Sequence, residues 1–533
     1  MKTLYAMYRL TGSMERARTA SPEVLIIGGG ATGAGIARDL AMRGAQVLLA
    51  EAGDFCTGAS GGNHGMLHSG ARYAVKDPQA AAECAVEGAT LKRIARSCIE
   101  DCGGMYVSLP SDDPEYGDLF LRSCRSAGIW TEELSVTEAR KAEPSLSLNV
   151  QRAVKVADAS IDPFFLVWSN VEAARQAGAE VRNYLPLRCF EVKDGRISGA
   201  MLGEGVNAIT VRPEMVINAT GAWCGRTAAM AGLKLEMQLD KGSMIVLNGR
   251  AVNGLVNRLR PPSDGDILVP HRSSTILGTT SGEGNLDGAR ATREESERLL
   301  REAAAAVPEV LSTRVVRAYA GVRPLLSGTG HGRKASRGFQ VVDHEDEGVD
   351  NLVSVAGGKL TTYRLMAEKA SDMVMSKLGR KASCRTMIED ISPPAESLSS
   401  FHRSLMASKY GIVSNKVADH CLSTPMGADE ACSCEAVTRG ELEFFASYPD
   451  VRSPADLMRR TRAGMGFCQA GLCAFRIAAL LPEGDPIEAA ESFLDERWKG
   501  IAPVLQGEQL RQEVFKAHIL KCYGLDHTGG GRR

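Results

Sequence analysis

The stretch EVLIIGGGATGAGIARDLAMRGAQVLLAEAG, residues 23–53, decides the fold. It predicts a strand, a glycine turn, a helix and a second strand. Val24–Ile27 are apolar without polar alternation, which is typical of a parallel strand buried on both faces. Gly28, Gly30 and Gly33 form G-x-G-x-x-G, a pattern that permits a tight turn, close backbone approach to a pyrophosphate and close helix packing. The stretch therefore predicts a dinucleotide-binding α/β domain.

Two later features extend this prediction. Glu51 ends the second strand, where a carboxylate binds a ribose hydroxyl in dinucleotide-binding domains. Residues 162–181 have a helical pattern, with Asp162 as the expected N-cap and Pro163 at the first helical position. An apolar strand runs into a turn within residues 213–223. This alternation of helices and strands favours a largely parallel sheet.

Length and charge limit the possible architectures and partners. The 533 residues suggest two or three domains. The net charge of −1 gives no general attraction for nucleic acid, so an anion site has to be built locally. We find no apolar run long enough for a transmembrane helix and no signal peptide, and we predict a cytoplasmic protein that reaches a membrane only through a partner. Residues 391–400, ISPPAESLSS, are the expected linker.

Further motifs follow one another in an order that is typical of one family. The sequence resembles the FAD-dependent glycerol-3-phosphate dehydrogenases, most closely the catalytic A subunit of the anaerobic three-subunit enzyme. The similarity covers roughly residues 22–505. Its motifs are GASGGNHGMLHSGARY at 58–73, NATGAW at 218–223, GVRPL at 321–325, SRG at 336–338 and VAGGKLTTYR at 355–364.

The resemblance implies both a fold and a cofactor. The fold class is α/β (α+β): a Rossmann-like FAD-binding domain interleaved with a mixed-sheet substrate domain of the glycine/D-amino-acid-oxidase type, plus a small helical C-terminal iron–sulfur domain. We assign FAD binding to Gly28, Gly30, Gly33, Glu51, Ser69, Gly70, Ala219, Gly221, Gly357, Gly358, Lys359 and Leu360.

The resemblance also implies a substrate, sn-glycerol 3-phosphate, which would be oxidised to dihydroxyacetone phosphate by hydride transfer to FAD. Arg323 and Arg337 are carried over as ligands of the phosphate, because a guanidinium binds phosphate oxygens in a bidentate way. Arg72 and Lys359 are carried over to positions beside the flavin, and His68 joins them as a catalytic candidate.

The general base stays open. In the aerobic single-subunit relatives a histidine follows the KGS stretch, whereas this sequence reads KGSMIVL and has Met244 at that position. Met244 cannot take a proton. Three histidines remain as candidates for the base: His64, His68 and His271.

Fourteen cysteines fall into two groups. Those scattered singly are expected to be small buried hydrophobes: Cys84, Cys98, Cys124, Cys189 and Cys224, among others. The other group is Cys432, Cys434, Cys468 and Cys473, spaced C-x-C, a 33-residue gap, then C-x₄-C.

Four thiolates in two close pairs suit zinc or an iron–sulfur cluster. The region around them resembles the bacterioferritin-associated-ferredoxin-like domain, which implies a [2Fe–2S] cluster. Structural zinc and unmetallated thiols are the alternatives, in that order. A cluster would accept the two electrons of reduced FAD one at a time and pass them to other subunits.

We therefore expect a leader at 1–21, an FAD-dependent oxidoreductase at 22–385, a linker and connecting helix at 386–425, a [2Fe–2S] domain at 426–485, a helical segment at 486–526 and a disordered tail at 527–533. By resemblance, the partners are a second soluble subunit plus a membrane-anchoring iron–sulfur subunit, which pass electrons to quinone at the cytoplasmic face of the inner membrane. Two alternatives stay open: an FAD-dependent 2-hydroxy-acid or amino-acid dehydrogenase of the same fold, and a non-catalytic redox-sensing or scaffold subunit.

Overall fold

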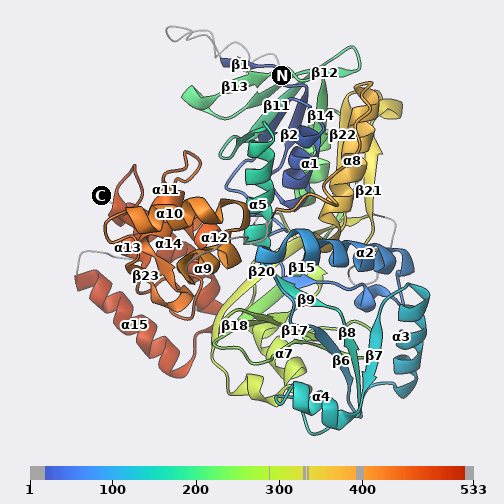
Figure 1. Cartoon of the computed structure of the whole chain (residues 1–533), viewed down its shortest axis with the longest axis vertical. Helices are drawn as coiled ribbons and strands as arrows, with labels where there is room; N and C mark the ends of the chain where they lie inside the picture. Colours follow the sequence, from blue (N-terminus) through green and yellow to red (C-terminus); the bar gives the residue numbers. More distant parts are fainter. Residues whose placement is uncertain (1–17, 287, 328–331, 333–334, 392–400, 523–533) are drawn as a thin grey trace.

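A six-stranded sheet forms the framework of the upper half of the molecule in Figure 1, in a computed structural model that describes residues 18–286, 288–327, 332, 335–391 and 401–522. The strands are parallel except at one edge, where β21 runs antiparallel to β22, so the expected, largely parallel sheet is confirmed. Their order is β10 (Glu180–Arg182), β3 (Val47–Ala50), β2 (Val24–Ile27), β14 (Met215–Asn218), β22 (Leu352–Gly357) and β21 (Phe339–Asp343). The expectations for residues 1–17, for 392–400 and for the C-terminal tail lie outside the described residues.

Helices pack on one face of this sheet and a second sheet packs on the other. The helices on the first face are α1 (Ala31–Met42), α5 (Pro163–Gln176) and α8 (Tyr363–Lys377). Helix α5 begins as predicted, because the Asp162 side chain accepts hydrogen bonds from the backbone N–H groups of Phe164 and Phe165. The opposite face is covered by α6 (Cys224–Ala229) and by the strands β1 (Arg18–Ala20), β13 (Ile209–Val211), β12 (Arg196–Leu202) and β11 (Leu187–Lys193).

A mixed sheet of nine strands, counted over the described residues, forms the lower half of the part of the chain at residues 18–391, which we call the body (Figure 1). Its strands come from two segments that alternate along the chain with those of the six-stranded sheet, so the two units are interleaved as expected. It contains β19 (Gly282–Glu283), β15 (Met237–Leu247), β18 (Ser274–Gly278), β17 (Ile267–His271), β16 (Leu255–Arg258), β6 (Gly104–Ser108), β8 (Arg152–Val156), β7 (Thr131–Leu134) and β20 (Val315–Leu326).

Smaller elements complete the body. Around the large sheet lie α2 (Pro78–Ile94), α3 (Pro114–Ser126), α4 (Val136–Ala142), α7 (Arg293–Ala304) and a small sheet of β4 (Met66–Leu67), β9 (Ala159–Ile161) and β5 (Ile99–Glu100).

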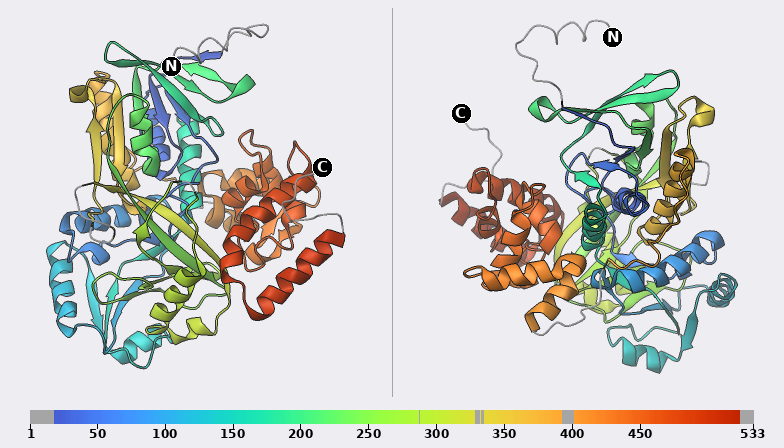
Figure 2. Two further views of the ribbon diagram at one scale, coloured as in Figure 1. Left: turned by 180° about the vertical axis from the view of Figure 1, so that it is seen from behind. Right: turned by 45° about the horizontal axis from the view of Figure 1, so that its top comes forward.

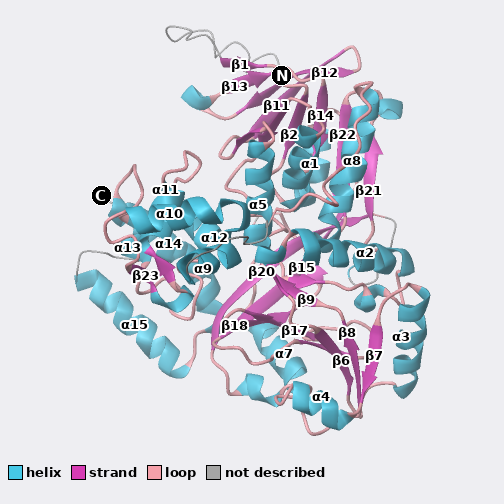
Figure 3. Cartoon of the chain, viewed as in Figure 1, coloured by secondary structure: helices cyan, strands magenta, loops and turns pink. Residues whose placement is uncertain are grey.

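The C-terminal part of the chain is a mostly helical module beside the body (Figures 2 and 3). It packs on α5, where the Trp168 ring meets the rings of Phe445 and Tyr448 at centroid distances of 6.0 and 5.3 Å. Helix α5 is buried along most of its length because it lies between the six-stranded sheet and the module. The module contains α9 (Phe401–Tyr410), α10 (Ser414–Ser423), β23 (Glu430–Cys432), β24 (Val437–Thr438), α11 (Arg439–Ala446), α12 (Pro454–Thr461), α13 (Ala474–Ala478), α14 (Pro486–Ile501) and α15 (Gly507–Cys522).

Most single cysteines behave as expected and are buried: Cys84, Cys98, Cys124 and Cys224. The prediction is wrong for Cys189, which is exposed because it lies on the solvent face of β11. None of the described helices is long and apolar enough to cross a membrane.

Candidate functional site

A cavity of about 740 Å³ opens at the carboxyl ends of β2 and β22 and is closed on its other side by β15 and β20. In α/β sheets of this kind, ligands bind outside the carboxyl ends of the strands. The predicted residues in its lining are Gly28, Gly30, Glu51, His68, Arg72, Ala219, Gly221, Arg323, Arg337, Gly357, Gly358, Lys359 and Leu360. The structure therefore brings together residues that are more than three hundred positions apart.

Three predicted residues support the cavity from behind instead of lining it. A side chain at Gly33 would lie 1.9 Å from the carbonyl oxygen of Gly28, so this glycine lets α1 pack directly on the turn. The backbone and hydroxyl of Ser69 both donate to Asp158 Oδ1 at 2.7 Å, and Gly70 adopts a left-handed conformation (φ +97°) against the carbonyl of Ala81.

The glycine turn leaves the N-terminus of α1 facing open space. Gly28 has φ +110°, and a Cβ there would lie 2.6 Å from the carbonyl oxygen of Ala219. The hydroxyl of Ser60 accepts a hydrogen bond from the N–H of Ala31 at 3.0 Å, which fixes the loop 58–65 over the turn. The N-terminus of a helix attracts anions, so this geometry suits a pyrophosphate.

Glu51 lies beside this turn. Its carboxylate accepts hydrogen bonds from the N–H groups of Gly29 at 2.6 Å and Gly53 at 2.9 Å. Burial raises the pKa of Glu51, and the hydrogen bonds from Gly53 and Gly29 oppose that rise. The carboxylate thus braces the turn and also lines the cavity.

Two partly buried arginines, Arg323 on β20 and Arg337 just before β21, meet in the lining of the cavity. Arg323 Nη1 lies 2.5 Å from Asp240 Oδ2, and its Nη2 donates to the hydroxyl of Thr279 at 2.6 Å. Arg337 Nη2 is 4.0 Å from the same oxygen of Asp240. Burial, followed by repulsion from Arg337, lowers the pKa of Arg323. One carboxylate therefore balances two guanidinium groups, which leaves a positive site that suits a phosphate.

Two further cations, Arg72 and Lys359, line the same cavity. Lys359 Nζ donates to the carbonyl oxygen of Arg337 at 2.7 Å and sits 4.9 Å from the centre of the Tyr73 ring. Arg72 Nη2 is 3.4 Å from Asp266 Oδ2. Both line the cavity, so its positive lining continues from the arginine pair.

Two of the three candidate histidines line the cavity. His64 Nδ1 accepts a hydrogen bond from the backbone N–H of Met66 at 3.2 Å. His68 Nε2 lies 3.3 Å from the Tyr73 hydroxyl, while its buried Nδ1 has no hydrogen-bond partner among the described residues. Burial, followed by nearby positive charge from Arg72 and Arg323, lowers the pKa of His64 to about 3.

The same physical effects act on His68. Burial, followed by His64 and Arg72, lowers its pKa well below the ordinary value, so it is neutral near pH 7. His271 is not among the lining residues; it lies at the boundary with the C-terminal module. Met244 does line the cavity.

Several residues of the site were missed from the sequence: Ser60, Tyr73 and Asp77, which line the cavity, and Asp240, which pairs with Arg323. Asp77 Oδ2 accepts hydrogen bonds from the hydroxyl of Ser336 and the backbone N–H of Arg337, so it shapes the arginine loop. Ser60 and Tyr73 lie inside the motif at 58–73 and Asp240 directly precedes KGS, so proximity to the motifs was the available signal.

The four clustered cysteines meet at one place in the module. Hydrogen bonds link the sulfurs of Cys432 and Cys468 to that of Cys473, which lowers the pKa of Cys432 to about 7 and of Cys468 to about 5. Cys434 lies next to Cys468. The backbone N–H of Gly464 also donates to Cys432 Sγ at 3.4 Å.

By their chemistry the four cysteines suit either expected metal occupant. In the described part of the chain, no group of three or more His, Cys, Asp or Glu side chains is arranged to hold a metal ion. The sulfurs nevertheless interact with one another: Cys473 with Cys432 and Cys468, and Cys434 with Cys468. Four thiolates supply the two ligands per iron of a two-iron cluster and also the four ligands of a tetrahedral zinc.

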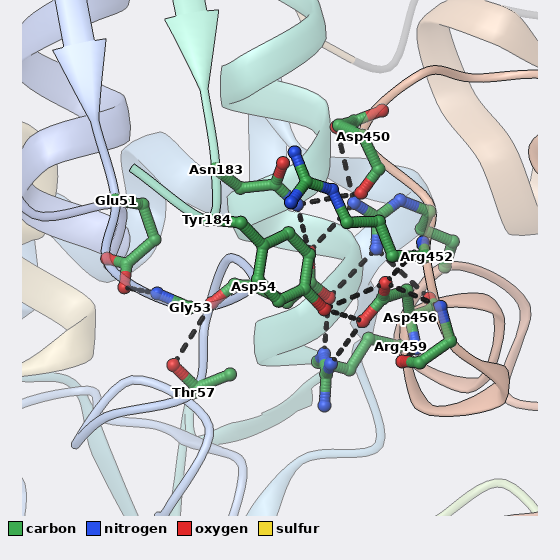
Figure 4. A network of polar contacts seen from close by, with 12 residues as sticks. Glu51, Gly53, Asp54, Thr57, Asn183, Tyr184, Asp450, Arg452, Asp456 and Arg459 are labelled. Atoms are coloured by element: carbon green, nitrogen blue, oxygen red, sulfur yellow. Dashed lines mark hydrogen bonds and ion pairs between the residues drawn. The ribbon is translucent and has the colours of Figure 1, made fainter. Parts of the chain in front are cut away.

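A buried network of charged groups joins the module to the loop after β3 (Figure 4). Both Arg459 and Arg460 bind the carboxylate of Asp54, at 2.5 and 2.9 Å. Burial alone would raise the pKa of Asp54, but Arg460 and Arg459 outweigh it and hold that pKa well below the usual range. Tyr184 donates to Asp456 at 2.7 Å in the same network. The loop that carries Glu51 is thereby tied to the module.

The cavity fits FAD on three observations: the open helix N-terminus at a glycine turn, the unpartnered Nδ1 of His68, and the backbone at Gly357 and Gly358. Both of these glycines line the cavity with positive φ, +82° and +84°, and a Cβ would run into the carbonyl oxygen of Gly338 or the sulfur of Met366, so this backbone course needs glycine. A dinucleotide cavity with a positive lining and neutral imidazoles suits a flavin-dependent oxidoreductase.

Comparisons with known proteins agree with this class. Residues 23–373 match the family model described as FAD dependent oxidoreductase, and residues 431–483 match that of the BFD-like [2Fe-2S] binding domain. The chain is 40% identical to the A subunit of the anaerobic glycerol-3-phosphate dehydrogenase of Escherichia coli K12, over 94% of its own length and 96% of that protein. The chain belongs to the FAD-dependent oxidoreductases and, among them, to the family of the anaerobic glycerol-3-phosphate dehydrogenase A subunits.

Solved structures confirm the fold. The FAD complex of the glycerol-3-phosphate dehydrogenase from Bacillus halodurans aligns with a TM-score of 0.69 at 22% identity, covering 91% of this chain and 96% of that one. Glycine oxidase from Geobacillus kaustophilus aligns with a TM-score of 0.55 at 22% identity, covering 71% and 100%. The predicted glycine-oxidase-type architecture is therefore correct.

Proposed function

We propose that this protein is an FAD-dependent glycerol-3-phosphate dehydrogenase that oxidises sn-glycerol 3-phosphate to dihydroxyacetone phosphate. The observation that carries the proposal is the pair Arg323 and Arg337, which share one carboxylate in the lining of a dinucleotide cavity. Bound FAD would supply a two-electron acceptor for the hydride from C2 of the substrate.

The residues of the cavity would divide the work. Arg323 and Arg337 bind the phosphate and so orient the substrate. Gly28, Gly30 and Gly33 support the pyrophosphate of FAD, and Glu51 keeps lone pairs for a ribose hydroxyl. The other FAD contacts that we propose are Ser69, Gly70, Ala219, Gly221, Gly357, Gly358, Lys359 and Leu360, of which Ser69 and Gly70 act by supporting the wall.

His68 is the base that the contacts favour. His64 Nδ1 already accepts from the N–H of Met66, so in the neutral ring its other nitrogen carries a proton and has no lone pair to offer. His68 has an unpartnered Nδ1, and Tyr73 can accept from its Nε2–H. His68 Nδ1 would then take the hydroxyl proton, while Arg72 and Lys359 stabilise the developing negative charge.

Electrons would leave through the cysteine site. We propose that Cys432, Cys434, Cys468 and Cys473 hold a [2Fe–2S] cluster, which takes electrons from reduced flavin one at a time. The relative in Escherichia coli is named as one subunit of an enzyme, and we propose that this chain likewise works with partners. They would be a second soluble subunit plus a membrane-anchoring iron–sulfur subunit, which pass electrons to quinone at the cytoplasmic face of the inner membrane.

One surface supports a partner at the cluster. Phe467 and Leu472 each lie next to a cluster cysteine and are 53% and 68% exposed. Apolar side chains this exposed favour a protein interface.

We propose the following domain boundaries: a flavin unit at 22–385, a connector at 386–425, the cluster domain at 426–485 and a helical segment at 486–526.

Anaerobic addition of sn-glycerol 3-phosphate to the flavin-loaded protein tests the proposal. Bleaching of the flavin absorbance is expected. Bleaching only by a 2-hydroxy acid or an amino acid would show that the cavity serves a different substrate. A spectrum that no substrate changes would favour a non-catalytic scaffold.

A further inference from the structure

Arg462 joins the two redox sites through one side chain. It ends α12 in a left-handed conformation (φ +70°), and its side chain is 5% exposed. Its Nε donates to Glu435 Oε2 at 2.8 Å within the module. Its Nη1 reaches into the body, where it lies 2.8 Å from Asp162 Oδ2 and 3.0 Å from His271 Nε2.

On the body side, this contact leads to the cavity wall. A guanidinium only donates, so His271 Nε2 is an acceptor and its Nδ1 carries the proton, which it donates to the Ser160 hydroxyl at 3.0 Å. The His271 ring lies against Gly65, where an added Cβ would be 3.9 Å from Nδ1. Gly65 directly follows His64, which lines the cavity.

On the module side, the contact leads to the cysteines. Glu435 directly follows Cys434, so the ion pair with Arg462 holds one cysteine loop. Gly464 lies two residues after Arg462, and its N–H donates to Cys432 Sγ. A buried cation therefore holds both loops of the cysteine site while it contacts the layer behind the cavity.

We propose that Arg462 is a positioning residue for electron transfer from the flavin cavity to the cysteine site. Its guanidinium holds the two sites at a fixed separation, and its positive charge favours the reduced form of the cluster. The inference rests on the proposed function in one respect, that a flavin and a [2Fe–2S] cluster occupy the two sites. The potentials of such clusters respond to nearby charge and to hydrogen bonds on the sulfurs.

The electron balance is simple. Oxidation of the substrate would leave two electrons on a bound flavin. A bound cluster would take them one at a time, with one of its two ferric ions reduced to ferrous on each occasion, and an external one-electron acceptor would take each electron from it. The protons of the reduced flavin would go to solvent. No bond to Arg462 forms or breaks.

Three full-length, flavin-loaded and cluster-loaded variants test the role. Arg462→Gln strands the buried carboxylates of Asp162 and Glu435. Glu435→Gln removes one negative charge but keeps an amide oxygen that accepts from Arg462. Arg439→Gln is the matched control, because its ion pair with Glu443 lies on the surface of the same module. The cluster midpoint potential is measured by redox titration with EPR detection, and cluster reduction is timed after photochemical reduction of the flavin.

We expect Arg462→Gln to shift the cluster potential in the negative direction and to slow cluster reduction by about tenfold to a hundredfold. Glu435→Gln should shift the potential in the positive direction, and Arg439→Gln should match the unsubstituted protein. A purely structural role of Arg462 does not predict that the cluster potential shifts in opposite directions in Arg462→Gln and Glu435→Gln. Unchanged potential and rate in Arg462→Gln, shifts of the same sign in both variants, or an equal effect of Arg439→Gln would overturn the proposal.

Two safeguards keep the test decisive. If Arg462→Gln does not retain its cluster, Arg462→Lys replaces it in the test, because lysine keeps the positive charge but lacks the forked guanidinium. In this variant the cluster potential should change less than the rate of cluster reduction. A rate that changes less than the potential, or an unshifted potential in Glu435→Gln, would overturn the proposal. Photochemical reduction needs no substrate. A protein that transfers electrons normally but is not bleached by glycerol 3-phosphate would contradict the proposed function and leave the role of Arg462 standing.

Discussion

The cavity and the cysteine site are held in shape by different forces. The cavity wall depends on backbone contacts, such as that between Gly62 and Gly321, where a Cβ on Gly321 would lie 1.9 Å from the carbonyl oxygen of Gly62. The cysteine site depends on buried charged side chains, above all Arg462, and its module is held to the body by Arg459 and Arg460. Steric fit at glycines dominates in the wall around the cavity, and electrostatic pairing dominates at the junction between the body and the module.

Because of this difference, the two sites should respond to different kinds of substitution. A steric contact fails when volume is added, whereas a buried ion pair fails when one partner is removed and the other is left unpaired. The cavity should therefore respond most to small additions at glycines. The junction with the module should respond most to neutralisation of a carboxylate that the arginines bind.

The largest effect is expected from Gly33→Ala. The new Cβ would lie 1.9 Å from the carbonyl oxygen of Gly28, so α1 must move away from the turn. We expect most of the bound flavin to be lost and the protein to be destabilised by about 4 kcal/mol or more. The flavin-to-protein absorbance ratio and the thermal unfolding midpoint measure these effects. Gly44→Asn is the control, because Gly44 has φ +81° with open space around it and asparagine tolerates that conformation; equal flavin loss in the control would refute the steric explanation.

Asp54→Asn should have the next largest effect. It leaves Arg459 and Arg460 buried without their shared carboxylate, which should cost about 3 kcal/mol. Limited proteolysis should then cut between the module and the body sooner than in the unsubstituted protein. The control is Asp101→Asn, whose ion pair with Lys92 is exposed and is worth less than about 1 kcal/mol. Proteolysis at the same rate in both variants would mean that the network does not hold the module.

The same difference explains how much the sequence could predict. Gly28 and Gly33 were predictable because a turn and a close helix contact require glycine locally, and the pattern of the neighbouring residues reports the strand and the helix. The helix start at Asp162 was predictable for the same local reason. The four cysteines were predictable from their spacing.

Ion pairs between residues that are far apart in the sequence were not predictable. Asp54 and Arg460 are 406 residues apart, and Asp240 and Arg323 are 83 apart. A charged residue in the sequence does not indicate its partner, because many opposite charges are available among 63 basic and 64 acidic residues. A motif can also point to the wrong partner. The motif at 58–73 predicted that Ser69 contacts the cofactor, but its hydroxyl donates to Asp158 behind the cavity lining.

Arg337→Ala tests the positive lining of the cavity, where the effect should be intermediate. Loss of a charged hydrogen bond to phosphate should cost about 2 kcal/mol, which raises KM for glycerol 3-phosphate about thirtyfold. Free glycerol lacks the phosphate, so its KM should change little. Steady-state kinetics with an artificial electron acceptor measures both. Equal changes for the two substrates would contradict a phosphate site at Arg337.

The smallest effect is expected from mild acid acting on His64, and it should distinguish the cavity from the cysteine site. His64 has a pKa of about 3 in the folded chain against an ordinary 6.5, so between these values the unfolded chain binds a proton that the folded chain does not. The stability that neutral His64 contributes is therefore complete above about pH 6.5 and falls as the pH is lowered, by about 1 to 2 kcal/mol at pH 5. The pKa values of His68 and His271 are lowered as well, so these rings add to the loss.

The carboxylate of Asp54 behaves differently. Its folded pKa is depressed, so the stability it contributes is present above the unfolded value of about 3.9 and is lost only as the pH falls further. Urea unfolding of the flavin-free protein at pH 7 and pH 5 should therefore show a loss that His64→Gln reduces and Asp54→Asn leaves unchanged. A loss that persists in full in His64→Gln would mean that mild acid acts elsewhere in the chain. A loss that disappears in Asp54→Asn would place the sensitivity to mild acid at the ion pairs of the module and not at the cavity wall.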